Sequence, residues 1–197
     1  MAKLLYQGHG SFRLESNIGT MFYIDPYAGA GYDLPADFIL VTHEHGDHNH
    51  VELPAKKHDT RILRAEDFLK YGSYHSEMLK DAKVTAVPAY NRNHSSEKCV
   101  GFIVFIDGIT LYFAGDTSKT DAMEGYVKDL KPDYAFLPTD GIYNMNAKEA
   151  SLCADMIGAK HSVPVHTAPG KLFSQTVAGR FHTESRLIIT PGEEIDL

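Results

Sequence analysis

The sequence contains few cysteines and no long hydrophobic segment. Cys99 and Cys153 are the only thiols, too few for a disulfide framework, and they lack metal-ligand spacing. We interpret both as small buried hydrophobic residues in a reducing compartment. The longest apolar run, Val100–Ile106, is far shorter than the roughly 20 residues that span a bilayer. The N-terminus shows no signal-peptide pattern. These absences predict a cytoplasmic protein without a membrane-spanning segment.

Positive charge is also scarce. The 197 residues include 26 acidic and 19 basic side chains, which gives a formal net charge of −7. Such a surface repels phosphate backbones on average, so we expect no nucleic-acid partner. We see no linker, repeat or low-complexity segment, and the hydrophobic content of 43% suits one sizeable core. We therefore expect a single domain over residues 1–197, whose oligomeric state the composition leaves open.

Strand patterns dominate the first half of the chain, and helical patterns alternate with strands in the second. The predicted strands cover residues 3–7, 11–15, 20–25, 37–41, 100–106, 109–114, 134–137, 162–165 and 186–189. Asp107-Gly108 between two of them predicts a tight hairpin. Capping residues and apolar stripes predict helices over about 121–130, 146–158 and 172–182. Together these elements predict a layered α/β (α+β) fold.

A dense group of ionisable side chains follows the predicted strand at residues 37–41. Its sequence is Thr42-His43-Glu44-His45-Gly46-Asp47-His48. Because alternate residues of an extended chain point the same way, His43 and His45 can present imidazoles to one metal ion. The glycine allows a tight turn, after which Asp47 and His48 can face a second ion. Imidazole and carboxylate ligands suit zinc, and also iron or manganese.

Three further candidate ligands lie beside later predicted strands. Asp116 follows the second strand of the hairpin, His166 follows strand 162–165, and His94 precedes the hairpin. Ligands carried by strand ends are held by the sheet, which favours a preorganised site. The candidate metal ligands are thus His43, His45, Asp47, His48, His94, Asp116 and His166. We interpret the remaining histidines as surface or packing residues: His9, His50, His58, His75, His161 and His182.

In this order, these motifs resemble the metallo-β-lactamase superfamily. The resemblance rests on residues 43–48, His94, Gly115-Asp116-Thr117 and His166, and it covers nearly the whole chain. Within the superfamily the chain is similar to small single-domain metal-dependent hydrolases, including L-ascorbate-6-phosphate lactonase-like proteins. The resemblance implies a four-layer αββα sandwich. It also implies one metal ion held by His43, His45 and His94, and a second held by Asp47, His48 and His166, with Asp116 bridging.

The activity expected from this site is hydrolysis of a small-molecule ester, lactone, amide or phosphodiester. Two divalent ions, Zn²⁺ with Mn²⁺ or Fe²⁺ as alternatives, would share a nucleophilic hydroxide. Asp47 would orient it or accept its proton, Tyr143 would donate to a developing oxyanion, and Asp25 would orient a ligand histidine. Three alternatives stay open: a small-substrate phosphodiesterase or nuclease, a di-iron redox protein, and a non-catalytic metal-binding sensor of the same fold.

The sequence offers both His94 and His75 as the third ligand of the first metal ion, and we predict that His94 fills this position. His75 lies in a segment typical of a solvated turn, whereas His94 follows the apolar run 84–87 and precedes the hairpin that carries Asp116. His94→Ala should therefore weaken metal binding and activity, while His75→Ala should behave as the wild type. Metal analysis of both variants checks this. Reversed effects, or a structure with His94 more than about 4 Å from any bound metal, would contradict it.

Overall fold

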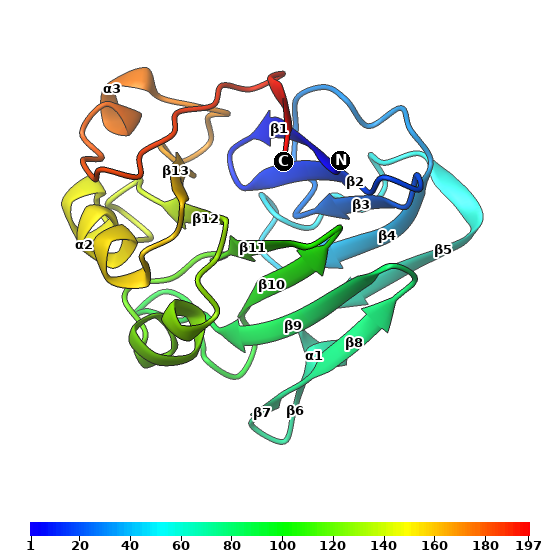
Figure 1. Ribbon diagram of the computed structural model, residues 1–197, viewed down its shortest axis with the longest axis horizontal. Coiled ribbons are helices and arrows are strands. Elements are labelled where there is room, and N and C mark those ends of the chain that lie inside the picture. Colours follow the sequence, from blue (N-terminus) through cyan, green and yellow to red (C-terminus); the bar gives the residue numbers. More distant parts are fainter.

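The computed structural model describes residues 1–197 and consists mainly of two six-stranded mixed sheets packed face to face (Figure 1). In spatial order, the first sheet contains β14 (Glu194–Asp196), β1 (Lys3–Gly8), β2 (Ser11–Glu15), β3 (Met21–Ile24), β4 (Ala36–Val41) and β5 (Lys56–Arg64). The second contains β13 (His161–Val165), β12 (Tyr134–Pro138), β11 (Ile109–Phe113), β10 (Val100–Ile106), β9 (Ala82–Pro88) and β8 (Ser76–Leu79). A separate small ribbon pairs β6 (Leu69–Lys70) with β7 (Ser73–Tyr74).

The main hydrophobic core lies between the two sheets. Because side chains alternate along a strand, Phe22 and Ile24 of β3 enter this core while Met21 and Tyr23 face outward. Phe12 of the first sheet contacts Phe136 of the second, with ring centroids 4.6 Å apart. The aromatic contacts across the interface fix the two sheets relative to each other, and therefore the loops at their common edge.

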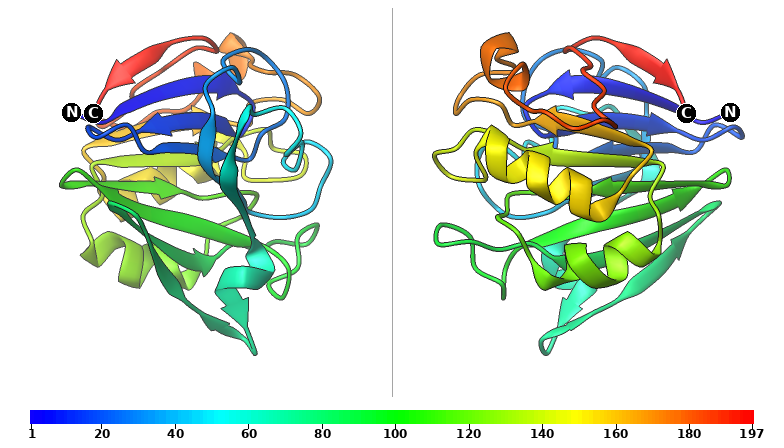
Figure 2. Two further views of the ribbon diagram at one scale, coloured as in Figure 1. Left: turned by 90° about the vertical axis from the view of Figure 1, so that its right-hand side faces the viewer. Right: turned by 60° about the vertical axis from the view of Figure 1, so that its left-hand side comes forward.

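Different structures cover the two outer faces of the sandwich. On the second sheet, α2 (Ala147–Ile157) and the π-helical η1 (Met123–Val127) bury apolar side chains in a second core (Figure 2). On the first sheet, the loops that connect its strands place Tyr32, Leu34 and Val51 against the outward-facing residues. The other helices, α1 (Ala65–Phe68) and α3 (Gln175–Ala178), are single turns. The predicted metallo-β-lactamase-like layered fold is confirmed, with loops as the outer layer on the first sheet.

Local signals in the sequence locate the hairpin and the longest helix well. Ile106 pairs with Ile109 across Asp107-Gly108, both of which have the positive φ angles of a type I′ turn. The Asn146 side chain caps α2 by accepting a hydrogen bond from Glu149 N at 2.9 Å, and the helix ends at Gly158 with φ 67°. Both elements have the boundaries that their turn and cap residues predict.

Two predicted elements are wrong in extent. Residues 186–189 form no strand, and Arg186 makes only an isolated bridge. Ile189 packs in the central core, which explains why this segment is apolar without being a strand. The helix predicted over 172–182 is limited to α3, because Ser174 caps its start and Gly179 its end. Phe173 and Phe181 pack against different cores, so their spacing does not reflect one helical face.

The helix predicted over 121–130 contains η1, and its apolar stripe is only partly buried. Met123 and Val127 are buried, whereas Tyr126 and Leu130 are exposed. Strands β5 to β9 were not predicted. The sequences of β5 to β8 are mixed polar ones without clear alternation, and within β9 only the apolar run 84–87 was noted. β14, which is three residues long, was also not predicted.

The structure agrees with the predictions that the cysteines form no disulfide framework and that no segment spans a membrane. Cys99 and Cys153 are both free and buried, and burial raises the pKa of each thiol to about 11. This confirms their interpretation as small hydrophobic residues. No helix has the combination of length and hydrophobicity that a bilayer crossing requires.

A buried carboxylate joins the sheets at the end where β4 begins. Asp37 is 3% exposed and accepts hydrogen bonds from Met21 N at 2.9 Å and from Lys57 Nζ at 2.6 Å. Lys80, in the turn after β8, donates to its other oxygen. Burial would raise the pKa of Asp37, but the two lysine ammonium groups hold that pKa below its ordinary value. The carboxylate thus links β3, β4 and β5 to the second sheet.

Asp37→Asn should lower the free energy of unfolding by about 1.5–3 kcal/mol at pH 7, because it removes the charge from three hydrogen bonds. The folded-state pKa of Asp37 lies below the unfolded one, so its contribution is present above the unfolded pKa and is lost as the pH falls through the folded pKa. In urea titrations the difference should therefore persist at about pH 5 and shrink below about pH 4. Asp33→Asn, at an exposed carboxylate, is the control, and equal effects of both changes would contradict this role.

Candidate metal centre

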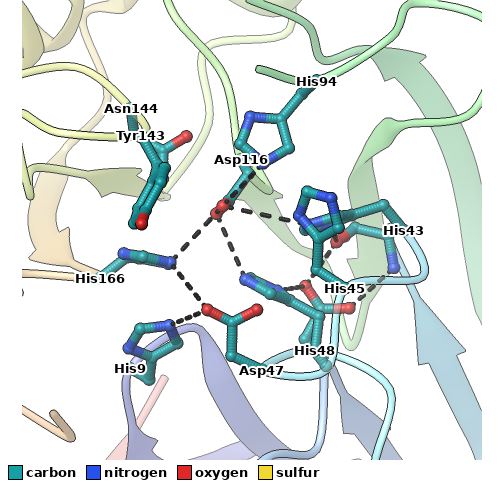
Figure 3. A network of polar contacts seen from close by, with 12 residues as sticks. His9, His43, His45, Asp47, His48, His94, Asp116, Tyr143, Asn144 and His166 are labelled. Carbon is teal, nitrogen blue, oxygen red and sulfur yellow. Dashed lines mark hydrogen bonds and ion pairs between the residues drawn. The ribbon is translucent and has the colours of Figure 1, made fainter. Parts of the chain in front are cut away.

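The histidines and carboxylates predicted as ligands meet at one edge of the sandwich (Figure 3). Residues 42–48 continue from β4, Asp116 comes after β11, and His166 comes directly after β13. His94 lies in the loop between β9 and β10. These segments converge because the strands that carry them end on the same side of the two sheets, where side chains can meet between the layers.

The first ligand group contains His43, His45 and His94. Each residue offers one ligand atom, and these three atoms all lie within 4.8 Å of one another. His43 Nε2 is 3.1 Å from His45 Nδ1, and the His94 ring lies beside both. His43 and His94 are buried while His45 is exposed, so solvent can reach this group from one side. His75 is exposed and lies outside the group, as the choice of His94 requires.

The second ligand group contains Asp47, His48 and His166, and it also includes His9. His166 Nε2 is 3.8 Å from Asp47 Oδ2, and His9 Nε2 is 3.1 Å from the same oxygen. His9 is fully buried and lies among these candidate ligands, so it is more than the surface or packing residue that the sequence predicts. One signal could have revealed it: His9 stands in a glycine-flanked turn directly after a predicted strand, the position that other ligands share.

Asp116 lies between the two groups. Its Oδ2 atom is 3.2 Å from His94 Nε2 and 3.5 Å from His166 Nε2, and its Oδ1 atom is 3.4 Å from His48 Nε2. Glycine is required at the preceding position, 115. Its φ is +64°, and a Cβ atom there would lie only 2.9 Å from Val100 O of β10. The structure therefore brings all seven predicted ligands together, with Asp116 in contact with both groups.

Other polar groups orient the histidine rings from outside. Asp25 Oδ2 is 2.9 Å from His48 Nδ1, as its predicted orienting role requires, and it also accepts from Thr42. The sequence did not identify two further groups of this kind. Asn91 Oδ1 lies 2.9 Å from His94 Nδ1, and Asp140 Oδ2 lies 3.0 Å from His166 Nδ1. Each contact leaves the Nε2 atom of that ring directed to the centre, which is how outer partners orient metal ligands.

Asp140 shares with the ligands its position just after a predicted strand, which is a usable signal. Asn91 has no such signal, because its role depends on the path of the loop. The other histidines, His58, His75, His161 and His182, are exposed as predicted. His50 is half-buried and contacts Glu52 outside both groups.

Several buried polar atoms at the centre have no hydrogen-bond partner: His48 Nε2, His166 Nε2 and Asp116 Oδ1. Each unsatisfied atom costs about 1–3 kcal/mol, so a cluster of them requires a ligand. Burial and the nearby charge of His48 lower the pKa of His43 well below its ordinary value. Burial would also lower the pKa values of His48 and His166, but nearby carboxylates raise both, that of His166 to about 10. For Asp116, burial would raise the pKa, but His48 and His166 hold it well below its ordinary value. This set of nitrogen and oxygen donors fits divalent transition metals.

A loop beside the second group is held by the same residues that orient the histidines. Tyr143 N donates to Asp140 Oδ1 at 2.7 Å, and Tyr143 O accepts from Asn91 Nδ2 at 2.9 Å and from Asn93 Nδ2 at 3.0 Å. The Tyr143 side chain is half-exposed and extends toward the His166 side of the cluster (Figure 3). Its backbone is thus fixed relative to both groups.

A groove of about 660 Å³ opens beside the first group. Its lining includes the three histidines of that group together with Arg64, Glu66 and Lys98. Arg64 is paired with Glu44 at 2.6 Å, so one of the two cations in the groove is already neutralised. Cavities of about 300–1,000 Å³ are typical of small-molecule sites.

Comparisons with known proteins agree with this geometry. The family described as the beta-lactamase superfamily domain matches residues 3–166. A UPF0173 metal-dependent hydrolase from Pyrococcus furiosus is 28% identical over the full length of both chains. A solved structure from Parabacteroides distasonis, described as a candidate metal-dependent hydrolase, is 30% identical, with a TM-score of 0.77 over 96% of this chain and 92% of that one.

The fold recurs in more distant structures. Igni18, a metallo hydrolase from Ignicoccus hospitalis, is 24% identical, with a TM-score of 0.76 over 98% of this chain and 97% of that one. That likeness concerns the fold alone, whereas the family match covers most of the chain, including the predicted ligands. The chain therefore belongs to the metallo-β-lactamase superfamily, in its branch of small-domain proteins.

Proposed function

We propose that this protein is a metal-dependent hydrolase that acts on a small molecule and uses two divalent ions, with zinc preferred and manganese or iron as alternatives. The main support is the position of Asp116, whose carboxylate contacts histidines of both ligand groups. The names of its relatives, which are metal-dependent hydrolases, point the same way. The small number of cysteines, both free, fits a cytoplasmic location.

The ions, when bound, would supply Lewis acidity and an activated water. Asp47 is the more accessible of the two carboxylates among the predicted ligands, with a side chain 33% exposed against 4% for Asp116. Burial would raise the pKa of Asp47, but its contacts with His166 and His9 lower that pKa below its ordinary range. Asp47 is therefore ionised at neutral pH and can accept a proton from water or orient it.

The groove beside the first group supports a small polar substrate. Its lining combines Arg64 and Lys98 with Glu44, Glu66 and Glu97, so it has no strong preference for one charge. A formal net charge of −7 over the whole chain disfavours nucleic acid as the substrate. We propose an ester, lactone, amide or phosphodiester of a small molecule as the bond that is cleaved.

Screening metal-loaded protein against lactones, acyl esters, amides and small phosphodiesters tests the proposal. Asp47→Asn should retain the fold but lower turnover by about 100-fold or more, because the proton acceptor loses its charge. Asp59→Asn, at an exposed position of β5, is the matched control and should behave as the wild type. Absence of turnover with every substrate class would contradict the hydrolase assignment, and full activity of Asp47→Asn would contradict only the role of Asp47.

Tyr143→Phe should lower kcat by about 100-fold, because the lost hydroxyl can no longer donate to an oxyanion formed beside His166. Steady-state kinetics on the substrate identified by the screen measures kcat and KM separately. Tyr126→Phe removes a hydroxyl from another exposed tyrosine, on η1, and should leave both constants unchanged. A larger KM with normal kcat would instead assign Tyr143 to substrate binding alone.

A further inference from the structure

His9 makes a set of contacts that a neutral histidine cannot satisfy alone. Its Nδ1 atom lies 3.1 Å from Lys171 O, a carbonyl oxygen that can only accept a hydrogen bond. Its Nε2 atom lies 3.1 Å from Asp47 Oδ2. If Nδ1 carries the proton, Nε2 presents a lone pair to a carboxylate oxygen, and two acceptors then face each other. Something positively charged must lie between Nε2 and Asp47 or on the ring itself.

The backbone at His9 is held in an unfavourable conformation to make these contacts. Its φ is +56°, in the left-handed region that few non-glycine residues adopt, although asparagine, aspartate and histidine do so more often than the others. Three hydrogen bonds hold it there: His9 N donates to Leu172 O, and His9 O accepts from His166 N at 2.8 Å and from Tyr6 Oη at 2.9 Å. The ring packs against His166, with centroids 3.7 Å apart. Strain of this kind is retained where the surrounding structure requires the side chain.

We propose that His9 Nε2 is an additional ligand of the second metal ion, beside Asp47, His48 and His166. This inference rests on the proposed function, because it requires an ion in that group. The ligand-atom spacings agree with it: Asp47 Oδ2 is 3.1 Å from His9 Nε2 and 3.8 Å from His166 Nε2. In the five-coordinate arrangement that His9, the three predicted ligands and a bridging Asp116 would give, atoms bound at about 2.0–2.1 Å to neighbouring positions are about 2.9–3.6 Å apart.

A ring with its proton on Nδ1, which lies 3.1 Å from Lys171 O, directs its Nε2 lone pair toward the centre of the second group, where an ion would accept it. The backbone carbonyl thus selects the tautomer that binds metal.

An additional ligand makes the two groups unequal. The second group would have His9 and two further buried imidazoles together with Asp47, whereas the first has three imidazoles, one of them exposed. The second group should therefore bind its ion more tightly and fill first. His9 lies in the β1–β2 turn, so the N-terminal strands would take part directly in metal binding.

Titration of metal-free protein with Co²⁺, followed by visible absorption and metal analysis, tests the inference. The wild type should bind two ions, the first more tightly. His9→Asn suits the positive φ, while its side chain is too short to replace the imidazole. It should weaken binding of one ion by more than about 100-fold, the upper end of what loss of an orienting partner costs, and should alter the spectrum of that ion. His75→Asn, at an exposed histidine, should match the wild type.

Two Co²⁺ ions bound by His9→Asn with unchanged affinity and spectrum would overturn the ligand role while leaving the proposed function intact. Failure of the wild type itself to bind metal would overturn both. If His9→Asn does not fold, a crystal structure of the zinc-loaded wild type decides the question. His9 Nε2 within about 2.3 Å of the second ion would support the inference, and a distance above about 3 Å, with Nε2 hydrogen-bonded to Asp47, would overturn it.

Discussion

The buried carboxylate of Asp116 and the imidazoles around it form a cluster that protein contacts alone do not satisfy. His48, His166 and Asp116 each leave a buried polar atom without a partner at its centre. Burying such groups costs free energy unless a cation completes their bonding, and that requirement explains why they are held so closely. The double sheet provides this arrangement because its aromatic interface fixes the edge at which the ligand-bearing loops meet.

Three of the seven non-glycine residues with positive φ angles lie at the same edge. Asp25, His9 and His166 have φ angles of 46°, 56° and 44°, and all three side chains belong to the metal centre or orient it. Such conformations cost about 1–3 kcal/mol each, and the surrounding hydrogen bonds must sustain them. Asp140 and Asn91 extend the same rigidity outward, since each orients one ligand histidine and also holds the backbone of Tyr143. The centre and the neighbouring loop that carries Tyr143 therefore form one preorganised unit.

The two ligand groups differ in their access to solvent. His45 is exposed and borders the groove beside the first group, whereas three of the four members of the second group are buried. In the proposed function, the first group would therefore meet the substrate and the second would hold its ion more firmly. Asp47 is the partly exposed member of the second group, which gives its carboxylate access to water.

The seven predicted ligands could be found from the sequence because local rules operate on them: alternation after a buried strand, a glycine turn, and polar residues just after strand ends. The same kind of rule located the Asp107-Gly108 hairpin and the Asn146 cap. Only the tertiary structure revealed His9, Asn91 and Asp140 as members or supports of the centre. The roles of His9 and Asp140 depend on partners 162 and 26 positions away in the chain, Lys171 and His166, whereas that of Asn91 depends on the path of the loop it shares with His94. Sequence spacing determined which side chains could bind metal, whereas the packing of the two sheets decided which of them meet, because contacts between distant segments exist only after the chain has folded.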